Sequence, residues 1–156
     1  MELALQDLEF LSVWAEKSGV KYPKDELNAL WKNVLLNQFH DILPGSAIHE
    51  VYDVTKQEYA AMEEQTRGLI AERLSAVARP EPGCVAVVNT LSFPRCDGFV
   101  FEADGVKALA DEDGTISPVQ RTADGRCVAY VRSIPPKGVK NFRMLTEASS
   151  AQNPLN

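Results

Sequence analysis

The sequence predicts an α+β protein organised by segments, an antiparallel three-helix bundle followed by a partial antiparallel β-sandwich. Before residue 80, apolar residues recur at helical spacing and glycines are few; most of the Gly and Pro residues and an alternating pattern come later. The change falls at Arg79-Pro80-Glu81-Pro82-Gly83, where two prolines and a glycine would end any helix. We therefore predict a bundle over residues 1–79, a β-sandwich portion over 80–147 and a polar, frayed tail over 148–156.

The first two helices are predicted by their apolar stripes and their ends. In the first, Leu5, Leu8, Leu11 and Ala15 lie on one face, and Gly19 stands where a left-handed C-terminal cap belongs. The second begins after Tyr22-Pro23, with acidic residues in its first turn, where the helix dipole favours them. Its stripe consists of Leu27, Leu30, Trp31, Val34 and Leu35.

The third helix is predicted to start after Ser46, a suitable N-cap that follows the Pro44-Gly45 break, and to run to Val77. Short loops give an up-down-up bundle. At 1.5 Å per residue the third helix would be roughly 45–50 Å long and the second only about 25 Å. The far half of the third helix therefore needs another partner, and we expect self-association as a homo-oligomer there. Its apolar residues are Met62, Leu69, Ile70 and Leu74.

The first helix is the natural partner for that half, yet its periodic pattern is already under way at the chain's first residues. We therefore expect the chain to be a piece of a larger protein.

Beyond the linker, about five short antiparallel strands are predicted from apolar alternation between turn signals. Their sequences are CVAVVNTL, GFVFEA, a hairpin of PVQRT and RCVAYVRS around Asp124-Gly125, and GVKNFRML, with a further turn at Asp113-Gly114.

Composition excludes several classes of function. The net charge is −6 and no run of Lys or Arg occurs, so nucleic acid and anionic membrane surfaces are poor partners. No apolar run approaches the 18 or so residues that span a bilayer. The acidic start, MELALQDLEF, does not read as a secretory signal. Cys84, Cys96 and Cys127 lack zinc-ribbon spacing, so we expect reduced, mostly buried thiols and a cytoplasmic protein.

One stretch, NQFHDILPGS, carries the candidate chemistry. His40 and Asp41 stand where the second helix must stop, between Leu35-Leu36 and Ile42-Leu43, which predicts a partly dry setting. A rigid helix end with an imidazole and a carboxylate can present a metal ligand beside a hydrogen-bond acceptor. An ordinary helix end remains the alternative. His49 is expected to have a surface or packing role, and the chain has too few such groups to form a complete active site.

The stretch LWKNVLLNQFHDILPGSAIHEVYDVTKQEY resembles the signature helix–loop–helix of the family 38 α-mannosidases, retaining glycoside hydrolases with a zinc-type metal site. LQDLEFLSVWAE is similar to the segment that leads into the family's three-helix middle domain, and VVNTLSFPR to the opening of its β-sandwich region. The resemblance extends to Leu145. Phe39 and the Leu-Pro-Gly-Ser loop resemble the cytosolic and bacterial branch.

The resemblance implies a role for each residue of the pair. His40 would complete a metal site, zinc in the full-length enzyme, whose other ligands come from an α/β catalytic domain absent here. Asp41 would bind hydroxyls of an α-mannoside, and the catalytic carboxylates would lie in the absent domain, so this part alone should be inactive. The alternatives are mannosylglycerate hydrolase on the same scaffold, or a non-enzymatic helical interaction module in which His40 is only a helix-end residue.

Overall fold

The computed structural model describes residues 1–147 and divides the chain into two compact units, one from Met1 to Val77 and one that begins at Ala78. We call them the helical unit and the β unit. The tail predicted over 148–156 lies outside the described residues. Within the described part, no helix combines the length and the apolar character that crossing a membrane requires.

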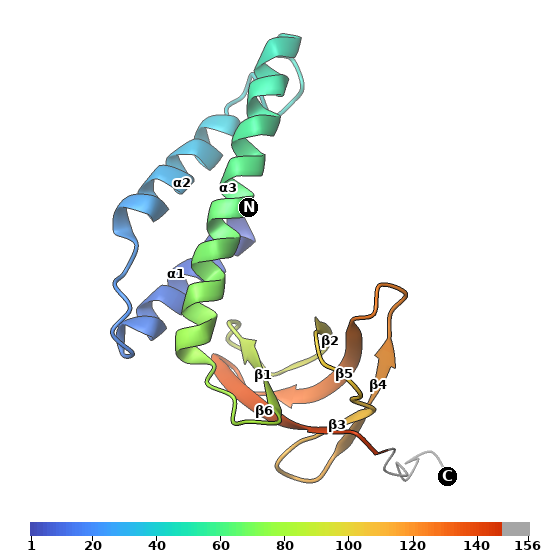
Figure 1. The fold of residues 1–156 in the computed structure, drawn as a ribbon. Helices are drawn as coiled ribbons and strands as arrows, with labels where there is room; N and C mark the ends of the chain where they lie inside the picture. The colour runs from blue at the N-terminus through green and yellow to red at the C-terminus, as the bar shows by residue number, and fades with distance from the viewer. Residues whose placement is uncertain (148–156) are drawn as a thin grey trace. The chain divides into compact units, whose positions relative to one another are not determined.

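The helical unit contains the three predicted helices, α1 (Glu2–Glu16), α2 (Lys24–Asn37) and α3 (His49–Val77). Figure 1 shows α2 running back against the direction of α1 and α3, with the α2–α3 loop at one tip of the unit. Gly19 has a φ of 83°, which confirms the predicted left-handed position after α1. All three helices contribute to one core, formed by Leu5, Leu8, Leu27, Leu30, Val34 and Met62.

The far half of α3 already has a partner, so the premise of the expected self-association surface is wrong. Met62 is 4% exposed, and Leu69 and Ile70 pack against the core. The reason is that α1 and α2 contact different parts of α3. Ser12 of α1 binds Arg73 in the far half of α3, whereas Asn37 of α2 binds Glu58 in the first half. Self-association through these residues stays a prediction, without that support.

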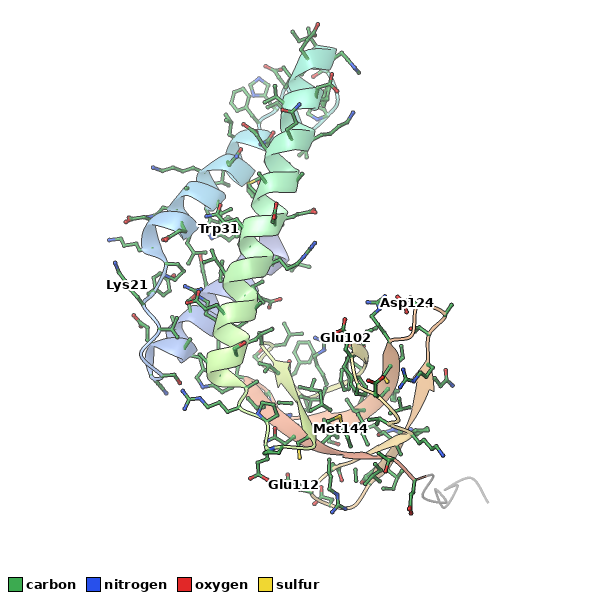
Figure 2. All side chains as sticks on the ribbon, in the orientation of Figure 1. Lys21, Trp31, Glu102, Glu112, Asp124 and Met144 are labelled. Carbon is green, nitrogen blue, oxygen red and sulfur yellow. The ribbon has the colours of Figure 1, made fainter. Side chains whose placement is uncertain are left out.

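Polar contacts hold the helices to one another as well. Figure 2 labels Trp31 of α2, whose indole N–H donates a hydrogen bond of 2.7 Å to Glu9 of α1. Arg73 is 3% exposed, and its guanidinium donates to the Ser12 hydroxyl at 3.0 Å and to the Lys21 carbonyl at 3.3 Å. One buried cation thus ties α3 to α1 and to the α1–α2 connection.

The described residues of the β unit form an antiparallel sheet of six strands in the order β1-β6-β3-β4-β5-β2. The strands are β1 (Cys84–Asn89), β2 (Arg95–Phe101), β3 (Ala108–Ala110), β4 (Ile116–Arg121), β5 (Cys127–Ile134) and β6 (Gly138–Leu145). The strand that sequence analysis missed is β3, because three residues are too few to show an alternating pattern. The predicted turns are present, with Gly114 and Gly125 at φ of 81° and 85°.

The interior of the β unit combines an apolar core with a buried ion pair. Met144, labelled in Figure 2, packs against that core from β6. Lys140 lies 2.8 Å from Asp111, and its ammonium also donates to the Arg132 carbonyl at 3.2 Å. The buried core residues are Val106, Leu109, Ala129, Val131, Ile134 and Phe142.

Within residues 1–147, β1 and β2 stand at the two ends of the strand order. β1 pairs with β6, and β2 pairs with β5 through a register shift between Arg95 and Asp97. The thiols are free, as expected, but only Cys127 is buried; Cys84 is half-buried and Cys96 is exposed. Cys96 is exposed because β2 alternates between covered and open positions, and Cys96 falls on the open side.

Candidate functional site

His40 and Asp41 lie in a turn beyond the end of α2, which corrects the prediction that the helix reaches His40. The helix ends at Asn37. Turn-type bonds follow it: the Phe39 N–H donates to Leu36 at 3.1 Å, and the Ile42 N–H donates to the Phe39 carbonyl at 2.9 Å. The pair is therefore presented by a hydrogen-bonded turn at the tip of the helical unit (Figure 1).

The side chains of this pair are open to solvent, and the expected partly dry setting is wrong for the described residues. His40 is 73% exposed and Asp41 66%, with His40 Nε2 lying 3.4 Å from Asp41 Oδ1. The apolar neighbours expected to cover them are themselves exposed, Leu36 at 61% and Leu43 at 73%. The Phe39 ring lies against the His40 ring, with the centroids 4.2 Å apart.

Ser46 does not cap α3, contrary to the sequence prediction. Its hydroxyl donates instead to the Asp41 carbonyl at 3.3 Å, and α3 begins later, at His49. Tyr52, in the first turns of α3, makes the stronger contact with this loop. Its hydroxyl accepts the Ala47 N–H at 3.0 Å and donates to the Ile42 carbonyl at 3.3 Å.

Asn37 is the buried polar residue at the base of the turn. It is 6% exposed. Its amide nitrogen donates to a Glu58 carboxylate oxygen at 3.0 Å, and its amide oxygen accepts the Thr55 hydroxyl at 2.8 Å. Next to it, the Gln38 amide donates to the Glu2 carboxylate at 2.5 Å. The end of α2 is thus tied to both α3 and α1.

A groove of about 330 Å³ lies beside the turn, between the end of α2 and the start of α3. Its walls are mostly apolar, and the polar groups Asn37 and Glu58 lie among them. The apolar lining comes from Leu36, Ile42, Val51 and Val54.

The described residues include no cluster of three or more His, Cys, Asp or Glu side chains that could hold a metal ion. A zinc site takes three or four protein ligands, so His40 can supply only one of them. Its exposed imidazole fits that partial role, because a ring that is open to solvent can join ligands brought by another part of a protein. The distance between His40 and Asp41 does not by itself indicate a metal site, because His49 lies equally far, 3.4 Å, from Asp53.

A second groove lies in the β unit at the β4–β5 turn, where Figure 2 labels Glu102 and Asp124. Arg126 pairs with Asp124 at 2.7 Å. The hydrogen bond from Arg126, followed by that from Thr122, lowers the pKa of Asp124 to about 2. Asp124 and Arg126 neutralise one another at an exposed hairpin.

Sequence reasoning missed Asn37 and Tyr52. For Asn37 a signal was present, because it continues the buried spacing of Leu27, Leu30 and Val34 in α2. A polar residue in such a stripe indicates a buried hydrogen-bond partner. For Tyr52 no signal was available, since its partners are backbone groups of the loop.

Comparisons with known proteins agree on one family. The model of the α-mannosidase middle domain matches residues 1–77. The α-mannosidase of Saccharomyces cerevisiae is 51% identical over 57 residues, which are 33% of this chain and 5% of that protein. Human α-mannosidase 2C1 is 34% identical over 100 residues, 62% of this chain and 10% of that protein. The chain thus spans a small part of the curated relatives it matches.

The fold of both units has a counterpart in a solved structure. The crystal structure of an α-mannosidase from Enterococcus faecalis V583 superposes with a TM-score of 0.71, covering 96% of this chain and 23% of that chain at 14% identity. That likeness shows the fold alone. The match over residues 1–77 and the identities above lead to one conclusion: the helical unit of this chain belongs to the α-mannosidase middle-domain family.

Proposed function

We propose that this chain is the middle-domain portion, with the adjoining β unit, of an α-mannosidase-type glycoside hydrolase. The observation that carries the proposal is the α-mannosidase middle-domain match over residues 1–77. Hydrolysis of an α-mannoside would need the full-length protein, because a retaining glycosidase uses two carboxyl groups about 5–5.5 Å apart on either side of the scissile bond. We assign those carboxylates to an α/β catalytic domain of the same protein and expect this chain to be inactive by itself.

Within that enzyme, His40 would supply one ligand to a divalent metal, zinc, and Asp41 would bind mannose hydroxyls. Both side chains are exposed and adjacent, on a turn at the tip of the helical unit. A neutral imidazole is a common zinc ligand, and a carboxylate accepts hydrogen bonds from hydroxyl groups. When bound, the metal would supply electrostatic stabilisation and orient the sugar. The part played by this chain is to hold the imidazole and the carboxylate side by side.

The test uses the full-length protein with an aryl α-mannoside. We expect His40→Ala to lower kcat/KM by at least about 100-fold, more than the loss of an outer partner of a metal ligand typically costs. His49→Ala is the matched control, because His49 is also exposed and also lies 3.4 Å from a carboxylate. It should leave the rate unchanged.

The outcomes separate the alternatives. Full turnover by His40→Ala would contradict the metal role and favour a helical module without a part in catalysis. Hydrolysis of mannosylglycerate in place of the aryl α-mannoside would keep the scaffold and change the substrate. Asp41→Asn should raise KM with little change in kcat, because a contact with the sugar hydroxyls forms on binding and persists equally in the transition state.

A further inference from the structure

We propose that Asn37 and Tyr52 are positioning residues that hold the His40–Asp41 turn from its two sides. The inference rests on the proposed function of His40 and Asp41. The hydrogen bonds that support it do not depend on that function, and their effect on the turn can be measured in this chain without any activity. Both residues act through the turn and neither is assigned to the metal or to the sugar.

Asn37 is a polar residue in the buried, otherwise apolar stripe of α2. Leu27, Leu30 and Val34 precede it at the spacing of a buried stripe, and each is at most 3% exposed. A buried amide is unfavourable unless it is hydrogen-bonded. Polar residues at such positions of packed helices fix the register at a cost in stability. Asn37 therefore indicates that the register of α2 at this end matters.

Asn37 also donates to Asn33 within α2, and its two partners on α3 fix both the rotation and the axial position of the end of α2. Thr55 and Glu58 lie one turn apart on the same face of α3. Thr55 donates to the amide oxygen at 2.8 Å, and the amide nitrogen donates to Glu58 at 3.0 Å. A sliding or rotation of α2 against α3 would break at least one of these bonds.

Tyr52 holds the other side of the turn. Its hydroxyl donates to the carbonyl of Ile42, the residue that follows Asp41, and accepts the N–H of Ala47 at 3.0 Å. The Tyr52 side chain is half-buried at the start of α3, so its hydroxyl is a fixed point. The loop thus closes onto α3 within a few residues of the candidate site.

Between these anchors, His40 and Asp41 have exposed side chains that contact each other and the Phe39 ring, so their placement depends on the backbone of the turn. A misplacement of about 1 Å at a reacting group can lower a rate by about 100-fold. Asn37 and Tyr52 are the described residues that transmit the rigid geometry of α3 to this turn.

The first experiment measures turnover and stability in the full-length protein. Tyr52→Phe removes only the hydroxyl, and Asn37→Leu continues the apolar stripe. We expect both to lower kcat/KM on an aryl α-mannoside by about 10–100-fold. The melting temperature of Asn37→Leu should fall, because the Thr55 hydroxyl and the Glu58 carboxylate lose their partner at the α2–α3 contact. A purely structural role would lower stability and leave the rate of the folded protein unchanged.

The matched control is Tyr59→Phe, the same chemical change on the same helix. Tyr59 packs against the core of the helical unit, away from the loop. We expect its turnover to stay within about twofold of wild type, well short of the effect of an outer-shell partner.

The second experiment reads the turn without any activity, by amide hydrogen exchange in the 156-residue chain. The N–H groups of Ile42 and Leu43 donate to the Phe39 carbonyl, and that of Gly45 donates to Ile42. In Tyr52→Phe and Asn37→Leu these amides should exchange at least about tenfold faster, because the local opening becomes easier. In Tyr59→Phe they should exchange as in wild type.

The outcomes distinguish this inference from the proposed function. If His40→Ala abolishes turnover while Asn37→Leu and Tyr52→Phe keep both wild-type turnover and wild-type exchange, the positioning inference is wrong and the proposed function stands. Faster exchange with undiminished turnover also overturns it. In that case the two residues hold the turn in the wild-type protein, but loosening the turn has no effect on catalysis. If His40→Ala retains full turnover, the proposed function fails first, and the positioning inference falls with it.

Discussion

The ammonium of Lys140 lies 2.8 Å from the carboxylate of Asp111, with the two side chains only 8% and 7% exposed. This pair joins the turn after β3 to the first half of β6. Asp111→Ala would leave the Lys140 charge buried without its partner, and we expect the free energy of unfolding to fall by about 3–5 kcal/mol. Urea unfolding measures it. Asp113→Ala, an exposed position in the same turn, should change it by less than about 0.5 kcal/mol.

The lowered pKa of Asp111 predicts that the contribution of the Asp111–Lys140 pair to folding stability depends on pH. Burial raises its pKa, but the hydrogen bonds from Lys140 and the Thr115 and Asp113 amides, with the charge of Lys140, outweigh it and leave the pKa below its ordinary value. The pair's contribution is therefore complete above the unfolded pKa of about 3.9 and is lost as the pH falls through the lower folded value. The stability advantage of wild type over Asp111→Asn should shrink below about pH 4. A difference that is constant between neutral and strongly acidic pH would contradict this.

Arg73 should not tolerate replacement by lysine. Its guanidinium donates from Nε to Ser12 and from Nη2 to the Lys21 carbonyl, two partners that one ammonium cannot reach together. We expect Arg73→Lys to lower the free energy of unfolding of the helical unit by about 1–3 kcal/mol. Arg67→Lys, at an exposed position on α3, serves as the control in the same denaturant titration.

Two glycines of the helical unit should respond in opposite directions to alanine. Gly45 has a φ of +84°, so Gly45→Ala should destabilise by about 1–2 kcal/mol through backbone strain, although nothing lies within 4 Å of the added methyl group. Gly68 is helical, also with open space around it. Gly68→Ala should stabilise by about 0.5–1 kcal/mol. Thermal unfolding of the two variants gives the signs directly, and equal signs would refute the argument.

Zinc should bind this chain weakly. The described residues supply one imidazole at the candidate site and no cluster of three ligands. A zinc titration by calorimetry on the isolated chain should show no stoichiometric site tighter than about 1 μM. Such a site, if it were lost in His40→Ala and kept in His49→Ala, would mean that the metal centre is complete without another domain.

Sequence reasoning located the helices because each is long enough to repeat its pattern several times. Leu27, Leu30 and Val34 identify the buried face of α2 without any knowledge of its neighbours. The same reasoning failed for β3, whose three residues show no period. It also failed for Ser46, because a serine before a helix can bond either to the helix or back to the loop, and here it donates to Asp41.

The candidate site was predictable in its residues but not in its surroundings. His40 and Asp41 stand out in the sequence by type and adjacency, and their roles remain predictions. Their exposure could not be inferred, since apolar neighbours in a sequence need not cover a residue in space. The anchoring by Asn37 depends on Thr55 and Glu58, which lie 18 and 21 residues away on another helix. A sequence pattern within one helix contains no information on such pairs.

The strand order of the β unit also determines where aggregation would begin. β2 is the last strand in the order, and its Arg95 and Asp97 form an ion pair beside a register shift. Charges and irregular pairing make such a strand a poor template for another chain. β1, at the other end, reads Cys-Val-Ala-Val-Val-Asn and carries neither charge nor proline. Such a segment has the composition of a steric-zipper strand. Partial unfolding of the β unit would therefore expose β1 to pairing with β-strands of other molecules. Ala86→Lys would place a charge on this strand and protect it against such pairing.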